Sequence, residues 1–287
     1  MSARAGRPMA VAEGAASGGV DALPARGVPA DGGGRAIRSS WVAPAVLVVA
    51  WIVFVVVVTN QALVASILGA LFPGARSPML PDPTLAALTA EHLLIVLIAS
   101  GIAVLIGVPL GIWVTRASGA DFRAIVSAGV DFGQVFPPIA VLALMLPILG
   151  LGLRPAIVAL VLYALFPIVS STVAGLENVS VAAVDAATGV GMSRGQVLRR
   201  IELPLSVAVI MAGIRTSVII IVGTATIAAA TGAGGLGLPI FTGISTQNLG
   251  YILEGAITVS VLALLLDATL ALVERWVTPR GLGEVAE

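Results

Sequence analysis

The sequence of 287 residues contains no cysteine and no lysine, and its single histidine is His92. Without cysteine, the chain has no disulfide, no thiolate metal site and no cysteine nucleophile. Without lysine, it has no G-x-x-x-x-G-K-[ST] phosphate-binding loop. One histidine cannot build a histidine-based metal cluster, and in "TAEHLL" we expect His92 to lie at the interface where a membrane helix begins.

Charged residues are also scarce. Only 10% of the residues are charged and 58% are hydrophobic, and the mean hydropathy is +1.09. A soluble domain cannot expose such a composition to water. The chain is therefore expected to have lipid as its solvent.

Long apolar runs account for this composition. A helix needs about 20 apolar residues to cross a hydrocarbon core of roughly 30 Å. Six runs of this kind occur, at 41–60, 93–115, 125–149, 155–176, 205–231 and 251–273. We predict an all-α polytopic membrane bundle of about six transmembrane helices. The lead before the first run is longer than the n-region of a signal peptide, so we expect that run to be retained.

Arginine supplies all 15 basic residues and indicates the orientation. With the N-terminus in the cytoplasm, the cytoplasmic side receives Arg4, Arg7, Arg26, Arg35, Arg38, Arg116, Arg123, Arg194, Arg199, Arg200, Arg275 and Arg280. Only Arg76 and Arg154 fall outside. This asymmetry predicts that both termini are cytoplasmic. Segments 1–40 and 276–287 are then cytoplasmic tails, the first disordered by composition, and 61–90 is an extracytoplasmic connection.

A glycine cluster, "AATGAGGLGLP", contains a G-x-G-x-x-G made of Gly232, Gly234 and Gly237, with Glu254 further along. A dinucleotide fingerprint follows a short strand, whereas this cluster follows an apolar run too long for a strand. We therefore reject nucleotide binding here. Together with Gly235, these glycines are expected to form a tight turn at the outer end of the fifth span, either beside a pore or gate or in a plain loop.

The longest charged break between spans, "LENVSVAAVDAATGVGMSRGQVLRRIELP", predicts two short helices on the cytoplasmic side. Ser180 is placed to cap the first, and Gly189 and Gly191 permit the turn that ends it. Ser193 and Gln196 form an S-x-x-Q capping box for the second.

The second of these helices is amphipathic. It presents Val197, Leu198 and Ile201 on one side and Arg199 and Arg200 on another. Such a pair of helices outside the membrane indicates a docking surface for another subunit. By structure alone, a helical loop lying on its own protein or on lipid headgroups is an equal alternative.

The same stretch resembles the cytoplasmic signature of ABC-importer permease subunits, in which an acidic residue and two alanines are followed by a glycine and then by I-x-L-P. The matching residues are Asp185, Ala186, Ala187, Gly191, Ile201, Leu203 and Pro204. The family usually has glutamate where this chain has Asp185, which keeps the charge but shortens its reach. Further matching stretches over 91–243, among them "EHLLIVLIASGIAVLIGVPLGIWVTR", resemble the glycine betaine/carnitine/choline branch of these permeases.

This resemblance implies a type I importer-like core over 91–275 with a coupling loop at 177–204. The helix at 41–60 lies outside that core and is expected to pack peripherally. The implied partners are cytoplasmic ATPase subunits, a second permease subunit in a homodimer or heterodimer, an external substrate-binding protein and the lipid bilayer of a bacterial cytoplasmic membrane, with no nucleic acid. The chain itself is expected to be no enzyme and to bind no cofactor, with ATP hydrolysed in the partner ATPase.

Charged residues of the coupling loop and prolines of the third span are the further candidate sites. Arg194, with Arg199 and Arg200, is expected to orient the docked ATPase by its charge. These charges add to the affinity only where the ATPase supplies partners for them, because a buried charge contributes affinity only when it is paired. Three prolines, Pro137, Pro138 and Pro147, interrupt the third span, as is tolerated where the backbone lines a cavity. Phe136 adjoins this break, and with Tyr163 of the fourth span it is a candidate to shape the pathway or gate; ordinary proline kinks are the alternative.

Arg215 lies deep in the fifth span, where an unpaired charge costs at least about 2.5–3.5 kcal/mol. We expect it to form a structural polar contact between helices rather than to bind solute. Asp131 and Asp267 are the acids nearest to membrane depth, and they are the candidates of a rival class, an ion-coupled secondary transporter. A membrane scaffold that transports nothing is a third class.

The solute is indicated by the resemblance alone. Quaternary ammonium groups are held by aromatic cages, and Phe132, Phe136, Tyr163 and Phe166 are candidates for a transient site. Glycine betaine, choline, carnitine or a proline-like compatible solute is expected. Related branches carry other small solutes such as amino acids, which is the alternative.

Overall fold

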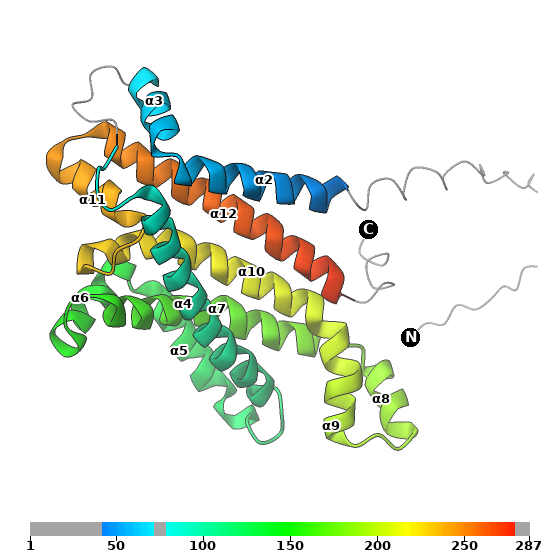
Figure 1. Ribbon diagram of the computed structural model, residues 1–287. Coiled ribbons are helices and arrows are strands. Elements are labelled where there is room, and N and C mark those ends of the chain that lie inside the picture. The colour runs from blue at the N-terminus through cyan, green and yellow to red at the C-terminus, as the bar shows by residue number, and fades with distance from the viewer. Residues whose placement is uncertain (1–41, 72–78, 279–287) are drawn as a thin grey trace, which may run out of the picture. The chain divides into compact units, whose positions relative to one another are not determined.

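The computed structural model describes residues 42–71 and 79–278, and the side chains of 131–134 are excluded (Figure 1). All regular elements in the described part are helical. They are α2 (Val42–Thr59), α3 (Gln61–Leu71), α4 (Leu85–Val114), α5 (Arg123–Val135), α6 (Pro138–Leu149), α7 (Leu153–Glu177), α8 (Val181–Gly189), α9 (Arg194–Val197), α10 (Leu203–Ala228), α11 (Gly237–Thr246) and α12 (Leu249–Val277). Short helical turns join some of them. The predicted all-α membrane bundle is confirmed.

Five helices in the described part are long and apolar enough to cross a membrane. They are α2, α4, α7, α12 and the continuous helical run Arg194–Thr231 that contains α10. The helices α8 and α9 lie at one end of the bundle, called here the α8–α9 end, and α3 and α11 lie at the opposite end (Figure 1). The predicted tail 1–40 and most of the tail 276–287 fall outside the described residues, although α12 extends to Val277.

The centre of the bundle is α7, which packs against α4 on one side and α10 on the other. Small residues allow these helices to approach closely. Ala99, Ala164 and Ala225, one from each helix, are fully buried in a shared apolar cluster. Gly111 of α4 lies against Thr172 of α7, where an added Cβ would come within 2.6 Å of the threonine Cβ. The core therefore depends on surfaces too close for larger side chains.

The third predicted span, 125–149, is interrupted at Pro137 and Pro138, as the sequence predicts, whereas Pro147 lies inside α6 and does not break it. The span is two shorter helices, α5 and α6, separated at Phe136 and Pro137, whose backbones are extended with ψ of 132° and 136°. A residue before proline avoids the helical region, and two successive prolines impose this on both positions. Pro138 then begins α6, where its missing N–H is harmless.

The segment 61–90, predicted as a connection, is partly helical. It holds α3 and the first turns of α4, which begins at Leu85, eight residues before the predicted 93. Thr84 caps α4, because its hydroxyl accepts a hydrogen bond from the N–H of Ala87 at 3.2 Å. The hydropathy pattern missed this start because the first turns of α4 are interrupted by polar residues.

The additional helix α2 packs on α12. The indole N–H of Trp51 donates to the Thr269 hydroxyl at 2.9 Å. Phe54 and Val58 of α2 are buried in the same apolar cluster as Leu262 and Leu265 of α12. The remaining surface of α2 is apolar and exposed, as expected for a helix that lies at the periphery in lipid.

Candidate coupling segment and pathway region

The coupling segment is the stretch 177–204 that was predicted as a coupling loop. Its first helix, α8, has the predicted cap at its start and a glycine turn after its end. The Ser180 hydroxyl accepts from the N–H of Ala183 at 3.3 Å. At the other end Gly191 has φ of +88°, a left-handed conformation that glycine adopts without strain. Gly189 is instead the last helical residue, so the turn depends on Gly191 alone.

The second helix, α9, has the predicted capping box. The Ser193 N–H donates to Gln196 Oε1 at 2.8 Å, and the Gln196 N–H donates to Ser193 Oγ at 3.4 Å. The helix α9 does not end before the next span. It continues through a π-helical turn, Leu198–Glu202, directly into α10.

Pro204 explains the π turn. It has no N–H to donate to the carbonyl of residue 200, and its ring clashes with that carbonyl in a regular α-helix. The turn widens instead, and the N–H of Leu203 bonds to the carbonyl of Leu198, five residues earlier. The helix α9, the π turn and α10 are thus one continuous helical run, and α8 is joined to it by the turn at Gly191.

Six of the ten residues predicted to couple to the ATPase are exposed. Asp185, Ala186, Gly191, Arg194, Arg199 and Arg200 are exposed, Ala187 is buried, and Ile201, Leu203 and Pro204 are half-buried. Within the described residues, the exposed acid and the three arginines form no ion pair. Val181 and Val190, at the two ends of α8, are 73% and 77% exposed. The segment presents apolar and charged groups that the chain itself does not cover.

Two ion pairs lie at the α8–α9 end. Arg116, just after α4, donates from Nη1 to Glu202 Oε2 at 2.7 Å. Arg123, at the start of α5, donates from Nη2 to Glu177 Oε2 at 2.8 Å. The first pair joins α4 to the π turn, and the second joins α5 to α7.

The glycine turn lies at the opposite end, between α10 and α11. Gly232, Gly234 and Gly235 all have positive φ, between +76° and +81°. The N–H of Gly235 donates to Glu91 Oε2 of α4 at 3.1 Å. Gly237 begins α11 and packs against the backbone of α10. A helix, not a strand, precedes the turn, so the rejection of a dinucleotide fingerprint is confirmed.

His92 is not the interfacial residue that was predicted. It is fully buried two turns into α4, and its Nε2 lies 3.1 Å from the Val222 carbonyl of α10. It packs directly under Gly235, where an added Cβ would come within 3.1 Å of His92 Nδ1. Glu91 and His92 together therefore attach the glycine turn to α4.

The predicted pathway residues lie partly together. Tyr163 of α7 is buried in one apolar cluster with Val141 and Leu142, which follow the break at Pro137 and Pro138. Ala233, inside the glycine turn, packs against the same cluster. Phe136, at the break, is exposed. The structure thus brings the break and the glycine turn to one region. The side chains of Phe132 and Asp131 are outside the described part of the structure.

Arg215 of α10 lies half-buried against two acids of α12. Its Nε and Nη2 donate to the two carboxylate oxygens of Asp267 at 2.5 and 2.7 Å. Glu274, two turns further along α12, lies 3.7 Å from Nη1. Sequence reasoning named Asp267 only as a rival ion site and missed Glu274. Their separation by seven residues places both on one helix face, and this was the available signal.

Glu254 is a further residue that the sequence did not assign. It is 2% exposed in α12, and its Oε2 accepts the N–H of Leu80 at 2.8 Å. It attaches the segment before α4 to α12. Among the described residues, no group of three or more histidine or acidic side chains lies close enough to hold a metal ion.

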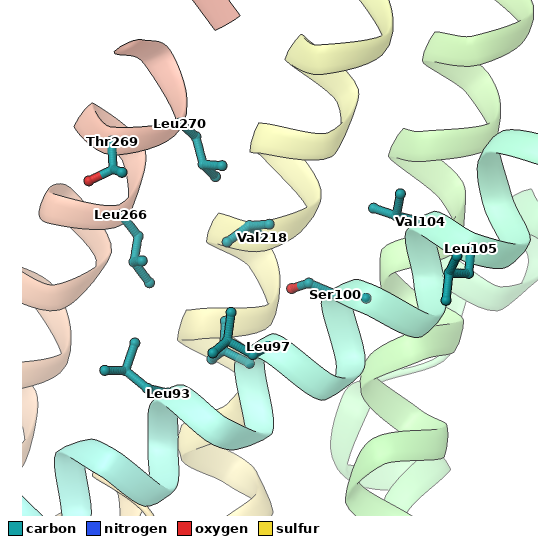
Figure 2. Close-up of a pocket in the computed structure, with 11 residues that line it drawn as sticks. Leu93, Leu97, Ser100, Val104, Leu105, Val218, Leu266, Thr269 and Leu270 are labelled. Carbon is teal, nitrogen blue, oxygen red and sulfur yellow. The ribbon is translucent and has the colours of Figure 1, made fainter. Parts of the chain in front are cut away.

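An apolar groove of about 450 Å³ lies between α4, α10 and α12 (Figure 2). Leu93, Leu97 and Val104 line one wall, and Leu266 and Leu270 line the other. Its lining includes no aromatic and no charged side chain. A groove of this chemistry suits lipid chains and lacks the aromatic faces that hold quaternary ammonium groups.

Comparisons with known proteins agree on one family. Residues 107–280 match the family described as binding-protein-dependent transport system inner membrane component. The chain is 42% identical over 199 residues to the glycine betaine/carnitine/choline transport system permease protein OpuCB of Bacillus subtilis, covering 69% of this chain and 91% of that protein. It is 38% identical over 203 residues to the osmoprotectant import permease protein OsmW of Salmonella typhimurium, covering 69% and 94%.

A solved structure gives the same picture. A chain of the MetNI methionine ABC transporter, in an inward-facing conformation, superimposes with a TM-score of 0.60 at 25% identity. The match covers 66% of this chain and 94% of that one.

Proposed function

The chain belongs to the family of binding-protein-dependent transport system inner membrane components, and from this we propose that it lines the translocation pathway of an ATP-driven importer for small quaternary ammonium solutes. The observation that carries the proposal is the coupling segment, an ordered helical unit whose charged and apolar groups are left uncovered by the chain. The proposed occupant of this surface is a cytoplasmic ATPase, which hydrolyses the ATP, while the permease chain binds no cofactor.

The distribution of arginine supports a cytoplasmic position for the coupling segment. Of the eight arginines among the described residues, Arg116, Arg123, Arg194, Arg199, Arg200 and Arg275 lie at the α8–α9 end. Arg154 lies at the start of α7, near the opposite end, and Arg215 is inside. Basic residues concentrate on the cytoplasmic side of membrane proteins. We therefore place both termini in the cytoplasm.

The solute class rests on the relatives. The names of OpuCB and OsmW assign glycine betaine, carnitine, choline and osmoprotectants to those proteins. The proposed solute here is glycine betaine or a similar compatible solute, delivered by a separate substrate-binding protein to a dimer of permease subunits. An amino acid is the second candidate, because the structural match to the methionine transporter favours it.

Uptake by the assembled complex in proteoliposomes tests this proposal. We expect labelled glycine betaine to accumulate only with ATP on the ATPase side, and to be displaced by choline or carnitine more strongly than by methionine. Uptake that follows an ion gradient without ATP would instead establish the secondary transporter. The ion pair between Asp267 and Arg215 argues against a secondary transporter, because the carboxylate of Asp267 is already occupied by the guanidinium and is not open to a coupling ion.

The docking surface makes a separate prediction. Replacing exposed Ala186 with arginine places a long cation in the middle of α8, and we expect co-purification of the ATPase to fall about tenfold. The added side chain would block the close approach of the ATPase or repel a positive charge on it, which weakens the interface by about 1.4 kcal/mol or more. Ser245→Arg, also exposed but on α11 at the opposite end, is the matched control and should bind the ATPase normally. Equal binding by both variants would contradict the docking assignment.

A further inference from the structure

The coupling segment is joined to the bundle in two ways. Through the π turn α9 continues into α10, so a displacement of α9 acts directly on that helix. The second connection is made by side chains. Within the described residues, the Arg116–Glu202 pair is the ion pair that joins the coupling segment to α4.

The geometry of this pair is restrained at both partners. Glu202 is the last residue of the π turn, and its side chain is only 12% exposed. Arg116 is 32% exposed, and its Nε also donates to the Thr115 hydroxyl at 3.3 Å. That hydroxyl in turn donates to the carbonyl of Ile112 at 2.7 Å, within α4. The guanidinium is therefore aligned with the end of α4 before it reaches Glu202.

The helix α4 extends from this pair to the opposite end of the bundle. Its 30 residues span about 45 Å at 1.5 Å per residue. Near its other end, Glu91 accepts the N–H of Gly235 and His92 packs under the same glycine. One helix thus contacts both the coupling segment and the glycine turn beside the predicted pathway region.

We propose that Arg116 and Glu202 are positioning residues for energy coupling, which pass the movement of the coupling segment to α4 and through it to the glycine turn. This inference rests on the proposed function. Without the pair, the ATPase still docks on α8 and still moves α10, but α4 is linked to that movement by packing alone, so the contacts of Glu91 and His92 on the glycine turn no longer follow the coupling segment closely. ATP is then hydrolysed without a matching amount of transport.

Charge exchange in the complete complex tests the inference. Arg116→Glu and Glu202→Arg each place two like charges in contact, and the double variant restores an opposite pair in reverse. Each single variant is expected to retain ATPase co-purification and thermal stability while solute transported per ATP hydrolysed falls about tenfold, the change expected when a close charge pair is broken. The double variant should recover most of this ratio.

The pair Arg123–Glu177 supplies a matched control. It lies at the same end of the bundle and has the same chemistry, but both side chains are more than 40% exposed and they join α5 to α7. Exposed ion pairs contribute little, so Arg123→Glu should change the transport ratio less than about twofold.

Three results would overturn the inference: a normal ratio in both single variants, a double variant that assembles but transports no better than the single ones, or losses of uptake and stability that run in parallel. Failure of the proposed function is distinguishable, because the unmodified complex would then show no ATP-dependent uptake.

Discussion

Replacing Arg215 with leucine is expected to lower the yield of folded protein in the membrane about tenfold or more, because the carboxylate of Asp267 then stays behind at membrane depth without its partner. Asp267 accepts both arms of the guanidinium, and Glu274 lies beside it. A charged side chain at the centre of a membrane helix costs about 2.5–3.5 kcal/mol on insertion scales. The pair is half-buried, with each side chain 35% exposed, and removing one partner leaves the other charge uncompensated, whereas removing both does not.

The double replacement Arg215→Leu with Asp267→Leu is the informative comparison. It removes the strongest hydrogen-bonded pair together, so we expect yield and thermal stability in detergent to recover most of the loss. Arg215→Lys should fall between, since an ammonium keeps the charge but cannot donate in the bidentate fork. A double variant as poor as the single one would show that Arg215 acts through something other than Asp267.

Gly213→Leu is the second large effect. Gly213 lies where α10 crosses α7, and an added Cβ would come within 2.6 Å of the Pro167 carbonyl oxygen and would collide with Ser171. Backbone cannot move aside as a flexible side chain can, so α7 and α10 must separate along the main interface of the bundle. We expect a loss of 1–3 kcal/mol or more, as in overpacked cores, measured by thermal unfolding of purified protein.

Gly223 on the same helix is the control. It is exposed, and an added Cβ there meets nothing within 4 Å. Gly223→Leu should leave stability within about 0.5 kcal/mol. Equal destabilisation by both substitutions would indicate that helix propensity or lipid contact, and not the α7–α10 spacing, determines the outcome.

Local features were the predictable ones. The caps at Ser180 and Ser193 and the turn at Gly191 depend on residues within a few positions of each other, so the sequence contains all that specifies them. The break in the third span was predictable for the same reason, since Pro137 and Pro138 are adjacent and each restricts the backbone of the residue before it.

Contacts between distant residues were not predictable in the same way. The pairs Arg215–Asp267, Arg116–Glu202 and Glu254–Leu80 join residues 52, 86 and 174 positions apart. Composition and periodicity indicate that such groups need partners, as was inferred for Arg215. They do not indicate which partner, because that depends on how the helices cross.

The widened π turn before Pro204 determines how the helices before it are oriented. One additional residue in a helical turn rotates everything before it by about 100° around the axis. The direction in which α8 and its exposed Asp185 point therefore depends on the ring of Pro204. The docking surface is oriented before a partner binds, so binding need not supply the free energy of orienting it.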